Sequence, residues 1–88
     1  MAMARRVSFP VPVLTVDNPQ RTDRSVTNSW VVWGDQQVFP GEAFSSLSVN
    51  AAGVGADEVI GARLTAVQNG VDAGSWYVVA YGTAISYG

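Results

Sequence analysis

The clearest pattern in the chain is an alternation of large and small side chains over residues 76–87. Large residues such as Tyr77 and Tyr81 occupy one set of alternate positions, and small residues such as Ala80 and Gly82 occupy the other. Successive side chains of a strand point to opposite faces of a sheet. The pattern therefore predicts a strand whose two faces pack in different environments.

Residues 59–68 permit two interpretations. As a strand they place Ile60 and Leu64 on one face. A helix over about 57–68 is the main alternative, because Ile60 and Leu64 are also one helical turn apart and Asp57 suits the position before a helix. We favour the strand, because Gly61 inside a helix costs about 1 kcal/mol.

Further strands are expected earlier in the chain. Residues 25–33 carry apolar groups at both odd and even positions, and residues 43–50 alternate apolar residues with serines, with Leu47 and Val49 inward. Pro40 followed by Gly41 has the chemistry of a type II turn between them. With turn residues every 8 to 12 positions, the sequence predicts an all-β fold: a small antiparallel sandwich or barrel of five or six strands.

The N-terminal part has a different character. Residues 7–16 are apolar and β-branched, but Pro10 and Pro12 each remove a main-chain donor, which favours an extended arm or an edge strand. A polar loop follows, so we divide the chain into an arm and loop over 1–24 and a single β domain over 25–88. The arm and loop hold four arginines against two aspartates, whereas the rest of the chain carries a net charge of −4. The arm is thus suited to an acidic surface of its own chain or of a neighbour.

Composition favours assembly over isolated folding. The chain has 88 residues, of which 48% are hydrophobic and 14% are charged, and it contains neither cysteine nor histidine. A domain of this size has a small core and often gains stability from disulfides, a metal or oligomerisation. Without cysteine and histidine the chain can form no disulfides and lacks the strongest metal ligands, so we expect it to gain stability as a homo-oligomer.

The same absences exclude most catalytic chemistry. Without histidine and cysteine the chain lacks the usual base at neutral pH, the thiolate nucleophile and the preferred ligands of transition metals. A carboxylate pair or a calcium site that includes Asp57 and Glu58 is formally possible, but acidic side chains in turns more often serve solvation. We predict no enzyme, no cofactor and no metal site. A sequence pI near 4.6 argues against nucleic acid as a partner, and no apolar run is long enough to span a membrane.

The aromatic residues are the remaining functional signal. Trp30 and Trp33 lie three positions apart, so a strand directs them to opposite faces. One face is then either covered by a second layer or exposed, and an exposed aromatic ring suits a protein interface or a sugar. The candidate interface or ligand contacts, in the arm and on the strands, are Arg5, Arg6, Phe9, Arg21, Arg24, Trp30, Trp33, Tyr77 and Tyr81.

Three features together carry a family resemblance: the proline-bearing segment Phe9-Pro-Val-Pro-Val13, the low charge, and the Ala/Gly/Val/Thr-rich second half of the chain. In these the chain resembles small β-rich accessory proteins of bacteriophage virions, such as capsid decoration proteins and tail modules. The resemblance implies a non-enzymatic subunit of a virion that oligomerises through its arm and its aromatic-rich strands. A carbohydrate- or receptor-binding β module is the alternative function.

Overall fold

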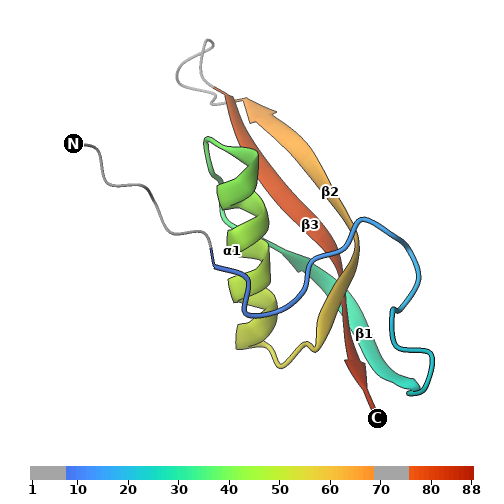
Figure 1. Cartoon of the computed structure of the whole chain (residues 1–88). Coiled ribbons are helices and arrows are strands. Elements are labelled where there is room, and N and C mark those ends of the chain that lie inside the picture. Colours follow the sequence, from blue (N-terminus) through green and yellow to red (C-terminus); the bar gives the residue numbers. More distant parts are fainter. Residues whose placement is uncertain (1–7, 69–75) are drawn as a thin grey trace.

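The computed structural model describes residues 8–68 and 76–88, and in this part of the chain a three-stranded sheet is covered on one face by a helix (Figure 1). The elements follow in the order β1 (Val26–Trp33), α1 (Pro40–Gly53), β2 (Glu58–Gln68) and β3 (Trp76–Tyr87). The strand order β1-β3-β2 puts β3 in the centre, antiparallel to both neighbours. The prediction of an all-β sandwich or barrel of five or six strands is therefore wrong, and the fold is α+β.

The error lies in the segment from residue 40 to residue 53, which is a helix and not a turn followed by a strand. Ala43, Leu47 and Ala51 are spaced four apart and fully buried, as in the apolar stripe of a helix. Val49, which the strand interpretation turned inward, is 50% exposed. Pro40 begins the helix because a proline in the first turn lacks only an N–H that has no partner within the helix. No helix in the described residues is long and apolar enough to cross a membrane.

The strand interpretation of residues 59–68 is confirmed, with an irregularity at Gly61. The register with β3 shifts by one residue after Ile60, and Gly61 has a φ of +62°. Such a bulge inserts one extra residue and changes which face the following side chains occupy. As a result Val59 and Ala62, which an uninterrupted strand would point to opposite faces, both lie in the core under the helix.

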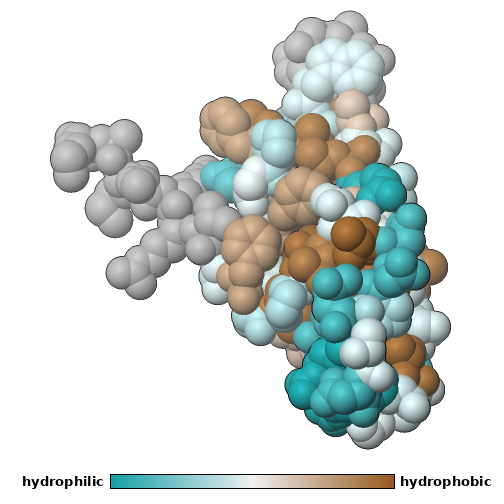
Figure 2. All heavy atoms as spheres, turned by 45° about the vertical axis from the view of Figure 1, so that its right-hand side comes forward, coloured by the Kyte–Doolittle hydropathy of each residue, from teal (hydrophilic) through white to brown (hydrophobic). Residues whose placement is uncertain are grey.

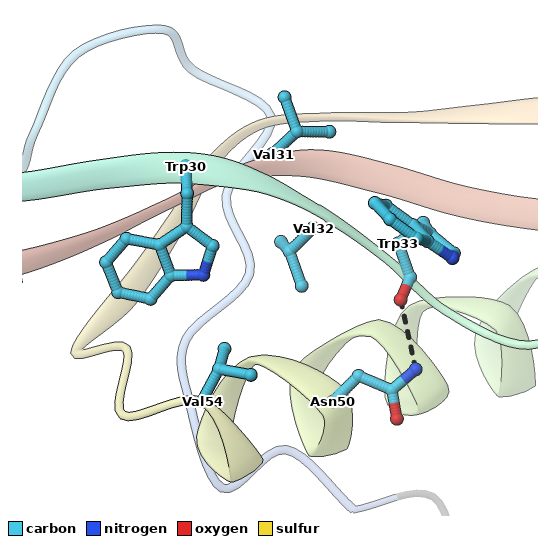
Figure 3. Close-up of a pocket in the computed structure, with 6 residues that line it drawn as sticks. All are labelled: Trp30, Val31, Val32, Trp33, Asn50 and Val54. Carbon is cyan, nitrogen blue, oxygen red and sulfur yellow. Dashed lines mark hydrogen bonds between the residues drawn. The ribbon is translucent and has the colours of Figure 1, made fainter.

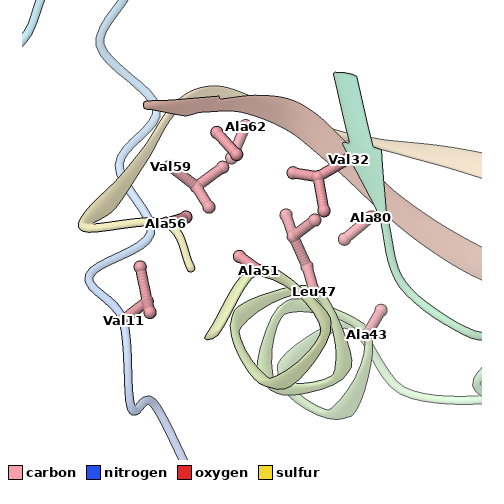
Figure 4. Packing of buried hydrophobic residues seen from close by; sticks show 10 residues of the cluster. Val11, Val32, Ala43, Leu47, Ala51, Ala56, Val59, Ala62 and Ala80 are labelled. Carbon is pink, nitrogen blue, oxygen red and sulfur yellow. The ribbon is translucent and has the colours of Figure 1, made fainter. Parts of the chain in front are cut away.

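The two-sided pattern of β3 is also confirmed. Its small residues Ala80 and Ala84 are fully buried against α1, and its large residue Tyr81 is on the opposite face and partly exposed. Small side chains on the central strand let the helix approach the sheet closely, so that Leu47 reaches the middle of the core. Figure 4 shows Leu47 directed from α1 toward Val32 of β1 and Ala80 of β3.

The described part of the N-terminal arm packs on its own chain. It crosses α1 and then runs beside the first half of β2 (Figure 1), where Val59 N donates to Pro12 O and Leu14 N donates to Val59 O, each at 2.9 Å. Two helix serines hold it: Ser48 Oγ accepts from Val11 N at 2.9 Å and donates to Val11 O at 2.6 Å, and Ser45 Oγ makes the same pair of bonds with Ser8. Val11 is buried as a result.

Candidate interaction surface

The face of the sheet opposite to α1, here called the outer face, is apolar and largely uncovered along its middle. Val31 and Trp33 of β1 are 69% and 63% exposed on it, and Tyr81 of β3 is 42% exposed. Trp33 pairs directly with Tyr81 in the strand register, and Val31 pairs with Thr83. The rings of Trp33 and Tyr81 therefore lie on neighbouring strands, at the separation of a direct cross-strand pair.

Figure 2 shows how apolar and polar residues are distributed on another side of the molecule, turned by 45° from the view of Figure 1. Apolar residues gather in the middle of the visible side, and hydrophilic residues gather lower down, where Figure 1 places the polar segment 17–24. Exposed apolar residues that are grouped, as Val31, Trp33 and Tyr81 are on the outer face, mark interaction sites more often than isolated exposed side chains do.

The outer face ends at an open edge of the sheet, because β1 has a strand neighbour on one side only among the described residues. Gly34 N donates to Ala80 O at 2.9 Å, which fixes the alternation of hydrogen bonds between β1 and β3. In an antiparallel pair, alternate residues direct their N–H and C=O to the partner strand. Because Gly34 points toward β3, the main-chain groups of Val31 and Trp33 point away from it. Trp33 O accepts from Asn50 Nδ2 at 3.0 Å, whereas Val31 presents its N–H and C=O at the edge.

A shallow cavity of about 170 Å³ lies beside this edge, between β1 and the end of α1 (Figure 3). In Figure 3 the side chains of Trp30, Val32 and Val54 lie on the helix side of the strand, and Val31 points to the other side. The cavity lining is apolar apart from one amide: Trp30, Val31, Val32, Trp33, Asn50 and Val54. An extended segment that paired with Val31 would bring alternate side chains over this cavity.

A second cavity, of about 230 Å³, lies where the arm crosses the helix. Phe9, Val13 and Thr15 of the arm and Phe44 of α1 line it. It lies at the arm, whereas the outer face and its edge involve β1 and β3.

The structure separates the residues that the sequence analysis grouped as contacts. Trp33 and Tyr81 lie together on the outer face, where Tyr77 also belongs by its register, whereas Trp30 is partly buried on the helix side. Phe9 is half exposed at the second cavity. Arg5 and Arg6 lie outside the described residues.

Arg21 and Arg24 are at the polar end of the molecule, where they close the loop on the sheet. Arg21 N donates to Tyr87 Oη at 3.2 Å, and its guanidinium lies 3.7 Å from Asp23. The Arg24 guanidinium lies over the Tyr87 ring, and its Nε donates to Gly88 O. These contacts are within the chain and do not adjoin Trp33.

Sequence reasoning missed Val31, Asn50 and Val54. Val31 looked like an ordinary strand residue, and Asn50 and Val54 were placed in and after a strand that is in fact a helix. The spacing of Ala43, Leu47 and Ala51 was the available signal for that helix.

The comparisons with known proteins point to one family model. Residues 38–88, more than half of the chain, match the model of the YbjQ family, whose description is "putative heavy-metal-binding". No curated protein and no solved structure matches the chain.

The residues present do not fit a heavy-metal ion. Such ions prefer thiolate and imidazole ligands, and the sequence contains neither cysteine nor histidine. Within residues 8–68 and 76–88 no three acidic side chains lie close enough together to hold a metal. The buried carboxylate of Glu58 already accepts hydrogen bonds from Gln20 N and Tyr87 Oη, at 3.0 and 2.9 Å.

The resemblance to bacteriophage virion proteins is wrong. It depended on composition and on an all-β reading of the second half of the chain, and neither is specific to a family. The helix overturns the β-sandwich, and the match over residues 38–88 points to a different group of proteins. The chain belongs to the YbjQ family.

Proposed function

We propose that the protein is a non-enzymatic subunit that assembles with copies of itself through the outer face and the open edge of β1. The observation that carries the proposal is the exposed pair of Val31 and Trp33, which combines the open main-chain edge at Val31 with two of the most exposed large apolar side chains in the described residues. A second copy would cover both features at once.

The edge supports assembly because unpaired strand edges readily accept another strand. Soluble proteins usually protect such an edge with charge, proline or a bulge, and β1 has none of these at its exposed end, Val31–Trp33. The other edge of the sheet is different. There residues 12–16 cover the first half of β2.

The outer face supports assembly by its composition. Interfaces are enriched in tryptophan and tyrosine, which combine a large apolar area with a hydrogen-bonding group. Complete burial of a large apolar side chain stabilises an interface by roughly 1.5–3 kcal/mol. A stable interface buries about 800 Å² of surface on each partner. The outer face offers Trp33, Tyr81 and Val31 toward that area.

Replacement of one edge residue by proline tests the proposal. The N–H of Val31 points away from β3, so Val31→Pro keeps the β1–β3 hydrogen bonds and removes a donor that only an added strand would use. Analytical ultracentrifugation should show a smaller species for Val31→Pro, with a native circular dichroism spectrum.

Two controls accompany this variant. Val31→Thr keeps the N–H and the branched side chain and should leave the assembly intact. Val49→Lys removes an equally apolar, half-exposed residue from α1 and should also leave it intact. An unchanged sedimentation coefficient for a folded Val31→Pro protein would count against the edge as an interface.

Carbohydrate binding is the second candidate, and the pairing of Trp33 with Tyr81 favours it. Two exposed rings on neighbouring strands form a surface on which a sugar ring can stack. A glycan array followed by titration of tryptophan fluorescence would decide. Saturable quenching that is lost in Trp33→Ser would support sugar binding, and no response to any glycan would leave assembly as the proposal.

A further inference from the structure

The acidic residues at the start of β2, Asp57 and Glu58, lie within the segment that matches the family model, and each carboxylate is already hydrogen-bonded within the chain. We infer that Asp57 and Glu58 form a structural clasp that closes the loop 17–25 over the end of the sheet, and that this chain binds no divalent heavy-metal ion. The inference concerns the chain's own residues and is independent of the proposed assembly.

The geometry of the clasp centres on Glu58, which is 5% exposed. Its Oε1 accepts from Gln20 N at 3.0 Å, and its Oε2 accepts from Tyr87 Oη at 2.9 Å. Tyr87 Oη in turn accepts from Arg21 N at 3.2 Å. The chain of bonds therefore links β2, the last residue of β3 and two consecutive amides of the loop.

Asp57 completes the clasp from the neighbouring position. Its Oδ2 accepts from Tyr87 N at 2.8 Å, and its own N–H donates to Ile85 O at 2.8 Å. Both acidic residues thus hold the end of β3, one through the main chain of Tyr87 and one through its hydroxyl group. Beneath them Ile60, Ile85 and Tyr87 form a small apolar cluster on the outer face.

A metal at this point would have to displace these hydrogen bonds. The carboxylate oxygens of Glu58 accept from an N–H and an O–H, which are donors that a cation would repel. The groups that donate to Glu58 are a main-chain amide and a phenol, and neither is a ligand that zinc, cadmium or copper prefers. Hard oxygen ligands alone do not select a thiophilic ion over calcium or magnesium.

The experiment has a metal arm and a stability arm. Equilibrium dialysis of the full chain against zinc, cadmium and copper(II) chlorides, each in turn, followed by elemental analysis, measures bound metal per chain. The positive control is the double variant Val49→His and Gly53→His, which places two imidazoles four residues apart on the exposed side of α1. This spacing lets both rings bind one ion.

The wild-type chain should retain no stoichiometric metal, whereas the double-histidine control should retain copper(II). Stoichiometric metal on the wild-type chain would overturn the inference, whether or not Glu58→Gln abolished it. The control shows that the assay detects a site with only two ligands.

In the stability arm, Glu58→Gln should weaken folding without any effect of added metal. Glutamine has one acceptor oxygen where glutamate has two, so either Gln20 N–H or Tyr87 O–H loses its acceptor, and the folding equilibrium constant should fall roughly tenfold. Tyr87→Phe removes the hydroxyl group and should produce a fall of similar size. A Glu58→Gln protein as stable as wild type in urea would contradict the clasp.

Discussion

Trp33 of β1 and Tyr81 of β3 face each other directly in the sheet, and both side chains are exposed on the side away from the helix. In a sheet with one helix layer this arrangement leaves a pair of aromatic rings in water. The fold therefore has a core between helix and sheet, built from alanines, valines and one leucine, and an outer face that carries large residues. The account of the protein as an assembling subunit depends on that contrast.

Trp33→Ser combined with Tyr81→Ser should dissociate the assembly and leave the monomer folded. The helix-facing core, which includes Leu47, Ala80 and Ala84, is not touched by these changes. Cross-linking followed by electrophoresis would show the loss of the larger species. A double variant that cross-links like wild type would mean that these rings are not at the interface.

Leu47→Ala should destabilise the protein by about 2–5 kcal/mol. Leu47 is fully buried and is the largest of the completely buried side chains in the described residues, so its removal leaves a cavity that alanine neighbours cannot fill. Urea denaturation followed by tryptophan fluorescence measures the change. Val49→Ala, on the exposed side of the same helix, should change the free energy of unfolding by less than about 0.5 kcal/mol.

Ser48→Ala should destabilise the protein by about 1–3 kcal/mol, because the main-chain N–H and C=O of buried Val11 both lose their partner. Ser45→Ala removes the same pair of bonds from Ser8 at an exposed site, where water replaces them, and should cost less. Hydrogen exchange at the Val11 amide should accelerate in the first variant. Equal effects of the two substitutions would contradict the burial of the arm at Val11.

Gly61→Ala should destabilise the protein by about 1–2 kcal/mol, because φ is +62° at this bulge and side-chain-bearing residues avoid that region. Gly53→Ala is the matched control. An added Cβ at Gly53 meets no atom within 4 Å, and alanine favours the helix, so this change should be neutral or stabilising by up to about 1 kcal/mol. Thermal unfolding measures both variants: the melting temperature should fall for Gly61→Ala and should rise or stay unchanged for Gly53→Ala.

A strand with strong alternation of large and small side chains could be predicted from the sequence. Alternation alone could not distinguish helix α1 from a strand. Residues 76–87 alternate large with small, which a helix would not require. In α1 the serines at 45, 46 and 48 and the valine at 49 suggested alternation, and only the spacing of Ala43, Leu47 and Ala51 indicated the helix. Alanine contributes so little to an apolar pattern that this stripe was weak.

The candidate surface was predictable only in part. The sequence predicts Trp33, Tyr77 and Tyr81 as candidate contacts from their residue type and from the alternation along the strands, and this prediction stays untested. The bonds that join Glu58 to Tyr87, and Ser48 to Val11, connect residues about 30 to 40 positions apart, and no local pattern indicates them. The exposure of Val31 follows from β1 being at the edge, which is a property of the strand order and not of the residue.

The mass of the wild-type protein in solution tests the central claim most directly. Multi-angle light scattering on a size-exclusion column should give a mass of at least twice that of the 9.3 kDa chain, because further copies then cover the outer face and the β1 edge. A single species of 9.3 kDa over the full range of accessible concentrations would contradict the account.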